Sequence, residues 1–210
     1  MTPVAGYYGL LIAGWVGAWL LFRAAGIDAL PGAARFAYWT TAKLLIWIAL
    51  VALIVRFAFR QPLAAYLGLV RAARGVRVGL AVGAAFVALA AVFDVFTRGY
   101  GWPSAGWGQV NALVVSPLFE EVMFRGYVLR TLEDDGYGFW RANLTAALMF
   151  LGLHLPGWFF MGVLQPSQVV TGVSIVLIGL VAGYARRRAG STWAAVAMHF
   201  VNNLYAASLR

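Results

Sequence analysis

Long apolar segments separated by short polar loops are the feature that most constrains the fold of this chain. A helix needs about 20 mainly apolar residues to cross the hydrocarbon of a bilayer. The composition agrees: 63% of the residues are hydrophobic and only 11% are charged, whereas soluble domains carry about 25% charged residues. We therefore predict an all-α fold, a polytopic transmembrane bundle of about seven spanning helices with a polar site inside the membrane. The predicted helices are Val4–Phe22, Phe36–Phe57, Val78–Phe96, Gly108–Thr131, Trp140–Leu155, Gln168–Ala185 and Thr192–Ser208.

Two of these segments differ from the others in length and polarity. Trp140–Leu155 is predicted to stop at the Pro156-Gly157 pair, because proline interrupts a helix, and Thr192–Ser208 is short and polar. Both suit an inner helix that lines a cavity better than a helix that faces lipid. No linker or repeat divides the chain, so we expect one integral membrane domain. Residues 1–107 would form N-terminal helices and a basic loop, and residues 108–210 the helical core.

Arginine residues gather in three of the predicted loops and indicate the orientation in the membrane. The clusters are Arg56, Arg60, Arg71, Arg74 and Arg77, then Arg130 and Arg141, then Arg186, Arg187 and Arg188. Because basic loops stay on the cytoplasmic side, we expect a multi-pass protein of the plasma (inner) membrane with a cytoplasmic N-terminus. This topology accounts for the net charge of +9, so nucleic acid is not an expected partner. Asp94 and Arg98 are predicted to form an ion pair at the membrane interface.

Two adjacent carboxylates, Glu120 and Glu121, lie inside the fourth apolar segment. A charged residue at the bilayer centre costs about 2.5–3.5 kcal/mol on insertion scales, so such residues usually serve a function. Glu121 and Arg125 are four residues apart and should pair on one helix face. Glu120 points about 100° away from Glu121 and is left without that partner. Pro117 should loosen the helix just before the acids, because it cannot donate a backbone hydrogen bond.

Both histidines of the chain also lie in apolar segments. His154 is four residues after Phe150, and His199 is four residues before Asn203, so each pair shares a helix face. Asn202 is three residues from His199 and competes with Asn203 for the same role. A carboxylate, two imidazoles and an amide can activate a water molecule: one group takes its proton and another stabilises the oxyanion.

A metal ion is an alternative that the spacing leaves open. Glu120, His154 and His199 match a ligand set of catalytic zinc sites, and a single zinc ion is the cofactor that they would hold. However, the H-E-x-x-H spacing that presents two ligands from one helix is absent. The chain has no cysteine, which excludes thiolate ligands, and it lacks a G-x-S-x-G nucleophile motif.

Three short motifs, taken together, resemble those of the CPBP intramembrane proteases, the CAAX protease and bacteriocin-processing family, which includes the type II CAAX prenyl endopeptidases. The resemblance covers about residues 108–206. The motifs are Glu120-Glu121-x-x-x-Arg125, Phe150-x-x-x-His154 and His199-x-x-x-Asn203. They occur in the family's order and in the expected helices. The resemblance implies a membrane-embedded endopeptidase with a catalytic core in residues 108–210.

The resemblance also implies roles for these residues. Glu120 and His154 would activate the water, and His199 and Asn203 would help to build the oxyanion site. Glu121 would complete the catalytic set.

Arg125 and Phe150 would shape the site around these groups. The family is described both as metalloproteases and as metal-free glutamate enzymes, so the resemblance does not decide the cofactor.

Three functions remain compatible with the sequence. The first is an intramembrane endopeptidase that acts on a peptide or protein substrate at the lipid bilayer. The second is a non-catalytic binding or immunity protein with the same fold. The third is a proton-relay transporter, because buried Glu and His residues also form relays. The transporter is the weakest of the three, since the chain shows no inverted repeat.

Overall fold

The computed structural model describes residues 3–94 and 99–209, and within that part of the chain it is helical, with no named strand. A single isolated bridge joins Tyr100 and Leu209. The helices are α1 (Pro3–Ala24), α2 (Gly32–Lys43), α3 (Leu50–Leu53), α4 (Leu63–Tyr66), α5 (Ala72–Asp94), α6 (Trp107–Val110), α7 (Ser116–Glu121), α8 (Leu129–Asp134), α9 (Phe139–Phe160), α10 (Gln168–Ala189) and α11 (Thr192–Ser208). The all-α prediction is thereby confirmed. The predicted Asp94–Arg98 ion pair lies outside the described residues.

Several short helices join into longer ones through wider, π-type turns. Such turns connect α2 to α3 at Leu44–Ala49, and extend α3 at Ile54–Ala58. Asn111–Val115 and Val122–Val128 likewise join α6, α7 and α8 into one helical stretch. A short 3₁₀ helix, Ile27–Ala29, lies between α1 and α2.

Within residues 3–94 and 99–209, five helices are long and apolar enough to cross a membrane. They are Pro3–Ala24, Gly32–Ala58, Ala72–Val92, Phe139–Phe160 and Gln168–Ala189. The prediction of about seven spans is therefore supported for five of the predicted segments. The other two are α6–α8 and α11, which are the segments with the two glutamates and with His199. Glu120, Glu121 and His199 are buried in the interior of the protein.

The predicted end of the fifth segment at Pro156 is wrong. Helix α9 continues through Pro156 to Phe160. Proline costs a helix the hydrogen bond to the residue four positions earlier, here Gly152, and its ring crowds that carbonyl. In a membrane bundle, neighbouring helices compensate for such a loss. Here α1 packs against this turn: Tyr8 donates to the Met149 carbonyl at 2.9 Å, and a Cβ at Gly152 would lie 2.1 Å from the Tyr8 hydroxyl.

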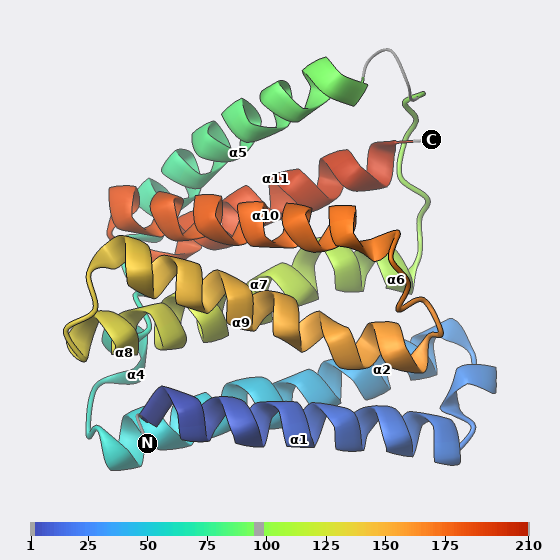
Figure 1. Cartoon of the computed structure of the whole chain (residues 1–210), viewed down its shortest axis with the longest axis horizontal. Helices are drawn as coiled ribbons and strands as arrows, with labels where there is room; N and C mark the ends of the chain where they lie inside the picture. The colour runs from blue at the N-terminus through green and yellow to red at the C-terminus, as the bar shows by residue number, and fades with distance from the viewer. Residues whose placement is uncertain (1–2, 95–98, 210) are drawn as a thin grey trace.

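The helices lie side by side in alternating directions, so the loops collect at two ends of the molecule (Figure 1). The N-terminus, α4 and the start of α9 lie at one end, and the C-terminus lies at the other. At the first end, Arg186 pairs with Glu133 at 2.8 Å, and the Thr192 N–H donates to the Gly68 carbonyl at 2.9 Å. The three predicted arginine clusters are therefore gathered at the same end of the bundle.

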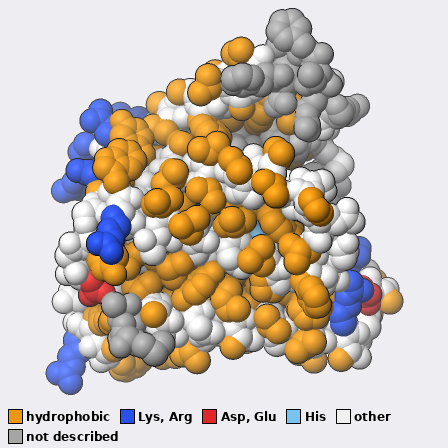
Figure 2. Space-filling model, viewed as in Figure 1, with side chains coloured by type: hydrophobic (Ala, Val, Ile, Leu, Met, Phe, Trp, Pro, Cys, Tyr) orange, Lys and Arg blue, Asp and Glu red, His pale blue; other side chains and the backbone are white. Residues whose placement is uncertain are grey.

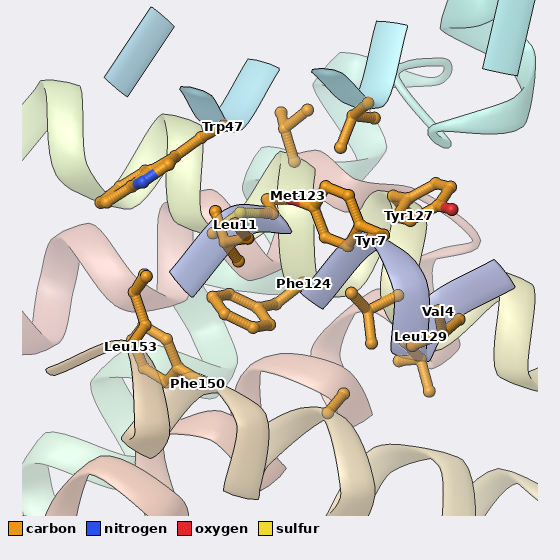
Figure 3. Packing of buried hydrophobic residues seen from close by; sticks show 14 of the residues in the cluster. Val4, Tyr7, Leu11, Trp47, Met123, Phe124, Tyr127, Leu129, Phe150 and Leu153 are labelled. Atoms are coloured by element: carbon orange, nitrogen blue, oxygen red, sulfur yellow. The ribbon is translucent and has the colours of Figure 1, made fainter. Parts of the chain in front are cut away.

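The stretch from α6 to α8 is the centre of the bundle. Side chains of Val122 to Leu129 are buried without exception, so this stretch is covered on every side. Figure 3 shows Met123, Phe124 and Tyr127 surrounded by Tyr7 and Leu11 of α1 and by apolar residues of neighbouring helices. A second, smaller core lies between α5, α10 and α11. The two adjacent glutamates thus lie directly before this fully buried segment.

The outer faces of the helices are apolar. Large hydrophobic side chains are exposed along them, and the face in Figure 2 shows these residues between basic groups near the ends of the molecule. Examples are Leu45, Leu89, Val92, Val169 and Val170. An exposed apolar surface of this extent is what lipid tails require, and the chain is a multi-pass membrane protein by this criterion.

Candidate active site

The glutamate helix is irregular on both sides of the two acids. A π-type turn at Asn111–Val115 precedes α7, and Pro117 lies at its first turn. Another π-type stretch, Val122–Val128, follows directly after Glu121. The loosening predicted from Pro117 is therefore present. Such π-type turns rotate the side chains that follow them and are frequent at functional sites. Glu120 is 8% exposed and Glu121 is fully buried.

The predicted pair of Glu121 and Arg125 is confirmed. The Arg125 Nη1 lies 3.1 Å from both carboxylate oxygens of Glu121, and neither side chain is exposed. The guanidinium carbon also lies 4.9 Å from the centre of the Phe150 ring, a cation–π distance. Gly179 of α10 leaves room for Arg125, since a Cβ there would lie 2.8 Å from Nη2. Phe150 and Arg125 therefore pack against each other beside Glu121.

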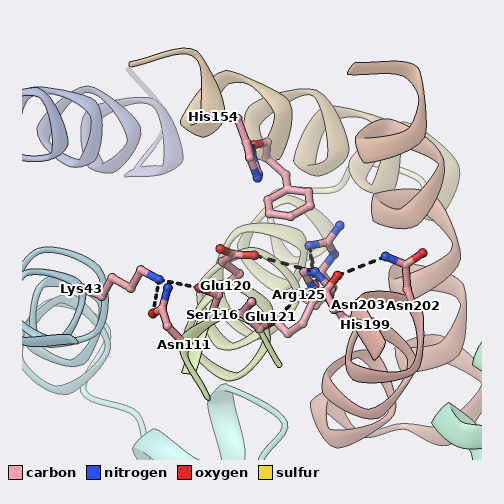
Figure 4. A network of polar contacts seen from close by, with 12 residues as sticks. Lys43, Asn111, Ser116, Glu120, Glu121, Arg125, His154, His199, Asn202 and Asn203 are labelled. Carbon is pink, nitrogen blue, oxygen red and sulfur yellow. Dashed lines mark hydrogen bonds and ion pairs between the residues drawn. The ribbon is translucent and has the colours of Figure 1, made fainter. Parts of the chain in front are cut away.

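His199 lies between the two glutamates (Figure 4). Its Nδ1 is 2.8 Å from Glu121 Oε1, and its Nε2 is 3.9 Å from Glu120 Oε2. An ionised carboxylate only accepts, so the Nδ1 carries the hydrogen in this contact. Helices α7 and α11 are joined by it across 78 positions of the chain. The structure thus brings the first and third motifs together.

His154 approaches Glu120 from α9, and Figure 4 shows its ring pointing toward the Glu120 carboxylate. The His154 Nδ1 lies 2.9 Å from the Phe150 carbonyl oxygen. A carbonyl can only accept, so Nδ1 carries the hydrogen and Nε2 of the neutral ring has a free lone pair. The ring is also held edge-on by Phe150, with the centres 4.9 Å apart. His154 is thereby fixed as a hydrogen-bond acceptor.

Glu120 and His154 line the same cavity, which has a volume of about 160 Å³. A cavity of this size admits several water molecules or one side chain of a substrate. Four tryptophans contribute to its wall. The lining residues are Trp15, Trp19, Lys43, Trp47, Glu120, Leu153, His154, Gly157, Trp158 and Met161. The arrangement therefore combines two proton acceptors with an apolar wall.

Lys43 belongs to this cavity, although the sequence analysis assigned it no role. It is 5% exposed, and its ammonium donates to Asn111 Oδ1 at 2.9 Å and to Ser116 Oγ. A signal was present in the sequence: Lys43 is the one lysine of the chain and lies inside an apolar segment. An intramembrane cation normally has an intramembrane anion or acceptor as its partner.

The asparagines lie farther from the cavity. The Asn203 amide donates to the Ala112 carbonyl at 2.8 Å, and its oxygen accepts from Asn202 at 3.1 Å. Neither residue lines the cavity that holds Glu120 and His154. Asn203 therefore ties α11 to the start of the glutamate helix, and one of its two amide hydrogens remains without a described acceptor.

The three-ligand metal set considered from the sequence does not fit the structure. Among residues 3–94 and 99–209, no group of three His, Cys, Asp or Glu side chains is arranged to hold a metal ion. Glu120, His154 and His199 come from three different helices, α7, α9 and α11. The designation as a metalloprotease is thus not supported.

Comparison with known proteins identifies the family. The model of the family described as "Type II CAAX prenyl endopeptidase Rce1-like" matches residues 102–205. This range contains the two glutamates, His154, His199 and Asn203. No curated protein and no solved structure matches the chain. The match covers the predicted motifs in order, and residues 102–205 belong to the Rce1-like family of type II CAAX prenyl endopeptidases, a family of membrane-embedded proteases.

Proposed function

We propose that this protein is an intramembrane endopeptidase in which Glu120 and His154 activate the water that cleaves a peptide bond. The observation that supports this proposal is the cavity that both side chains line. Two acceptors in one small cavity can hold a single water molecule through its two hydrogens. Its oxygen lone pair is then free to attack a carbonyl carbon.

The chemistry follows from the protonation of the groups. The water donates one hydrogen to Glu120 and the other to His154 Nε2, which is the free acceptor of that ring. As the water oxygen attacks, its proton passes to the Glu120 carboxylate, and the carbonyl electron pair moves to the oxygen. Glu120 then gives this proton to the amine nitrogen while the carbon–nitrogen bond breaks. Such general acid–base steps contribute about 10²–10⁴ in rate.

His199 and Asn203 are proposed to stabilise the oxyanion, as the family resemblance implies. The Nδ1 hydrogen of His199 is held by Glu121, and its Nε2 lies 3.9 Å from Glu120 Oε2. A hydrogen on Nε2 would place a donor beside the reacting carbonyl. Asn203 would use the amide hydrogen that the Ala112 carbonyl does not occupy. In this proposal, Glu121 and Arg125 fix the orientation of the His199 ring.

The proposed function can be tested by comparing the membrane proteins of cells that contain the active protein with those of cells that contain an inactive variant. The native protein and the Glu120→Gln variant are expressed at equal levels, and the termini of membrane proteins and peptides are compared by mass spectrometry. The expected result is at least one new terminus that appears only with the native protein. Identical sets of termini, together with a cellular phenotype that the variant retains, would favour the binding or immunity protein instead.

A further inference from the structure

Four fully or nearly buried charged side chains lie around the site, two of each sign. They are Lys43, Glu120, Glu121 and Arg125. The charge of Arg125 compensates that of Glu121, since Arg125 Nη1 lies 3.1 Å from the Glu121 carboxylate. This leaves Glu120 and Lys43 as an anion and a cation in one cavity. Burying either charge without compensation costs several kcal/mol, so their presence in the same cavity needs a reason.

The position of Lys43 is fixed by the helix that carries Glu120. The ammonium binds Asn111 Oδ1 at 2.9 Å and Ser116 Oγ, and Ser116 is one turn before Glu120 on the same helix face. Figure 4 shows Lys43 reaching from its own helix toward Ser116 and the Glu120 side of the site. Its Nζ also lies 5.3 Å from the centre of the Trp47 ring. Two hydrogen bonds occupy two of the three donors, and one remains.

Apart from Lys43, the group facing Glu120 that can add a positive charge is His199, when both of its ring nitrogens carry hydrogen, as the proposed oxyanion role requires. His154 on α9 is an acceptor toward the cavity. His199 on α11 has its Nε2 3.9 Å away, and its Nδ1 bonds Glu121. Arg125, on the helix of Glu120 itself, lies against Glu121 and the Phe150 ring. Helix α1 contributes only the indoles of Trp15 and Trp19 to the cavity.

We propose that Lys43 is a positioning residue that acts through Glu120. Its ammonium compensates the carboxylate across the cavity, so that Glu120 can face water inside the membrane, where a bare carboxylate is costly. The hydrogen bonds to Asn111 and Ser116 hold the cation in place and thereby set the distance between the two charges.

A thermodynamic cycle tests this pairing without any substrate. Thermal unfolding is followed for the native protein, Lys43→Met, Glu120→Gln and the double variant in the same detergent. Each single variant leaves one buried charge uncompensated, so we expect each to lower the Tm by roughly 5 °C or more. The double variant should unfold at a higher temperature than either single variant. If the decrease in Tm of the double variant equals the sum of the two single decreases, the proposal is overturned.

A matched control separates charge compensation from the mechanical tie between the helices. Ser116→Ala removes one acceptor of Lys43 but keeps both charges. When Ser116→Ala and Glu120→Gln are combined in one protein, the decrease in Tm should equal the sum of the two single decreases. If Ser116→Ala shows the same coupling as Lys43→Met, the tie and not the charge explains the result, and the proposal fails.

The kinetic part of the proposal rests on the proposed peptidase function, whereas the stability cycle does not. Lys43→Met should lower kcat at least tenfold and leave KM within about threefold, because the group acts on the base and not on the substrate. Lys43→Arg keeps the charge and should restore part of kcat. A raised KM with unchanged kcat would instead make Lys43 a substrate contact. If no preparation cleaves any peptide, the cycle still decides the pairing.

Discussion

The Nδ1 of His199 lies 2.8 Å from Oε1 of Glu121, and this contact joins two motifs that are 78 residues apart. Glu121 therefore has two partners, because Arg125 approaches the same carboxylate from the next turn of its helix. One consequence is a fixed orientation of the His199 ring. Another is that Glu121 is a structural centre of the site, while Glu120 is left to face the cavity.

Removal of Arg125 should destabilise the protein strongly. Arg125→Ala leaves the Glu121 carboxylate buried with its cation lost, and breaking a buried pair in this way costs about 3–5 kcal/mol. The measurement is the midpoint of thermal unfolding in detergent. Arg130→Ala is a matched control, since Arg130 and Asp134 form the same i,i+4 pair at 2.9 Å with about half of each side chain exposed. Exposed pairs contribute only about 0–1 kcal/mol. Equal stability of Arg125→Ala and the native protein would contradict the pairing.

The close contact between α5 and α11 should depend on Gly79, which has no side chain to separate the helices. A Cβ at Gly79 would lie 2.3 Å from the Ala194 carbonyl oxygen, which belongs to the backbone and cannot move aside. Gly79→Ala should therefore separate the two helices and lower the Tm, by a cost of about 1–3 kcal/mol that is typical of overpacking. Gly17→Ala is the control, because nothing lies within 4 Å of a Cβ there. It should be neutral or slightly stabilising. A similar Tm for both variants would show that this contact is not close.

The sequence predicted the class of the fold and much of the site, for physical reasons that are visible in single residues. Glu121 and Arg125 are neighbours on one helix, so their pair follows from helical geometry alone. The helix predicted at Thr192–Ser208 has the same bounds as α11.

Features that depend on other helices were not predictable in the same way. The turn of α9 before Pro156 contacts α1, where Tyr8 donates to the Met149 carbonyl. Lys43 becomes part of the cavity only because its helix packs beside Asn111 and Ser116. The contact of Asn203 with the Ala112 carbonyl is also a tertiary contact. Spacing within one segment carries no information about these neighbours.

The orientation in the membrane can be tested with single cysteines, because the native chain has none. Arg74, Arg187 and Arg35 are all exposed, so cysteines there can be reached by reagents in solution. With a cytoplasmic N-terminus, cysteine at Arg74 or Arg187 should resist an impermeant thiol reagent in intact cells, whereas cysteine at Arg35 should react. Permeabilised cells, in which all three should react, serve as the control. The opposite pattern of protection would reverse the proposed orientation.

Loss of either of the two proposed water-activating groups should slow cleavage strongly and leave the protein folded. Glu120→Gln keeps the shape of the side chain but removes the base, and His154→Ala removes the second acceptor for the water. Each should lower kcat by about 10²–10⁴ in a reporter-peptide assay with purified protein in liposomes. The unfolding temperature of each variant is measured in parallel, so that a loss of activity is not confused with a loss of structure.

Glu133→Gln is the matched control for this pair of variants. It makes the same chemical change on the same helical stretch, but Glu133 bonds Arg186 at the end of the bundle and does not line the cavity. We expect it to keep its turnover. If Glu120→Gln cleaves the reporter as fast as Glu133→Gln, then Glu120 is not the base. If only His154→Ala retains activity, Glu120 activates the water alone, and the His154 lone pair that faces the cavity has another purpose.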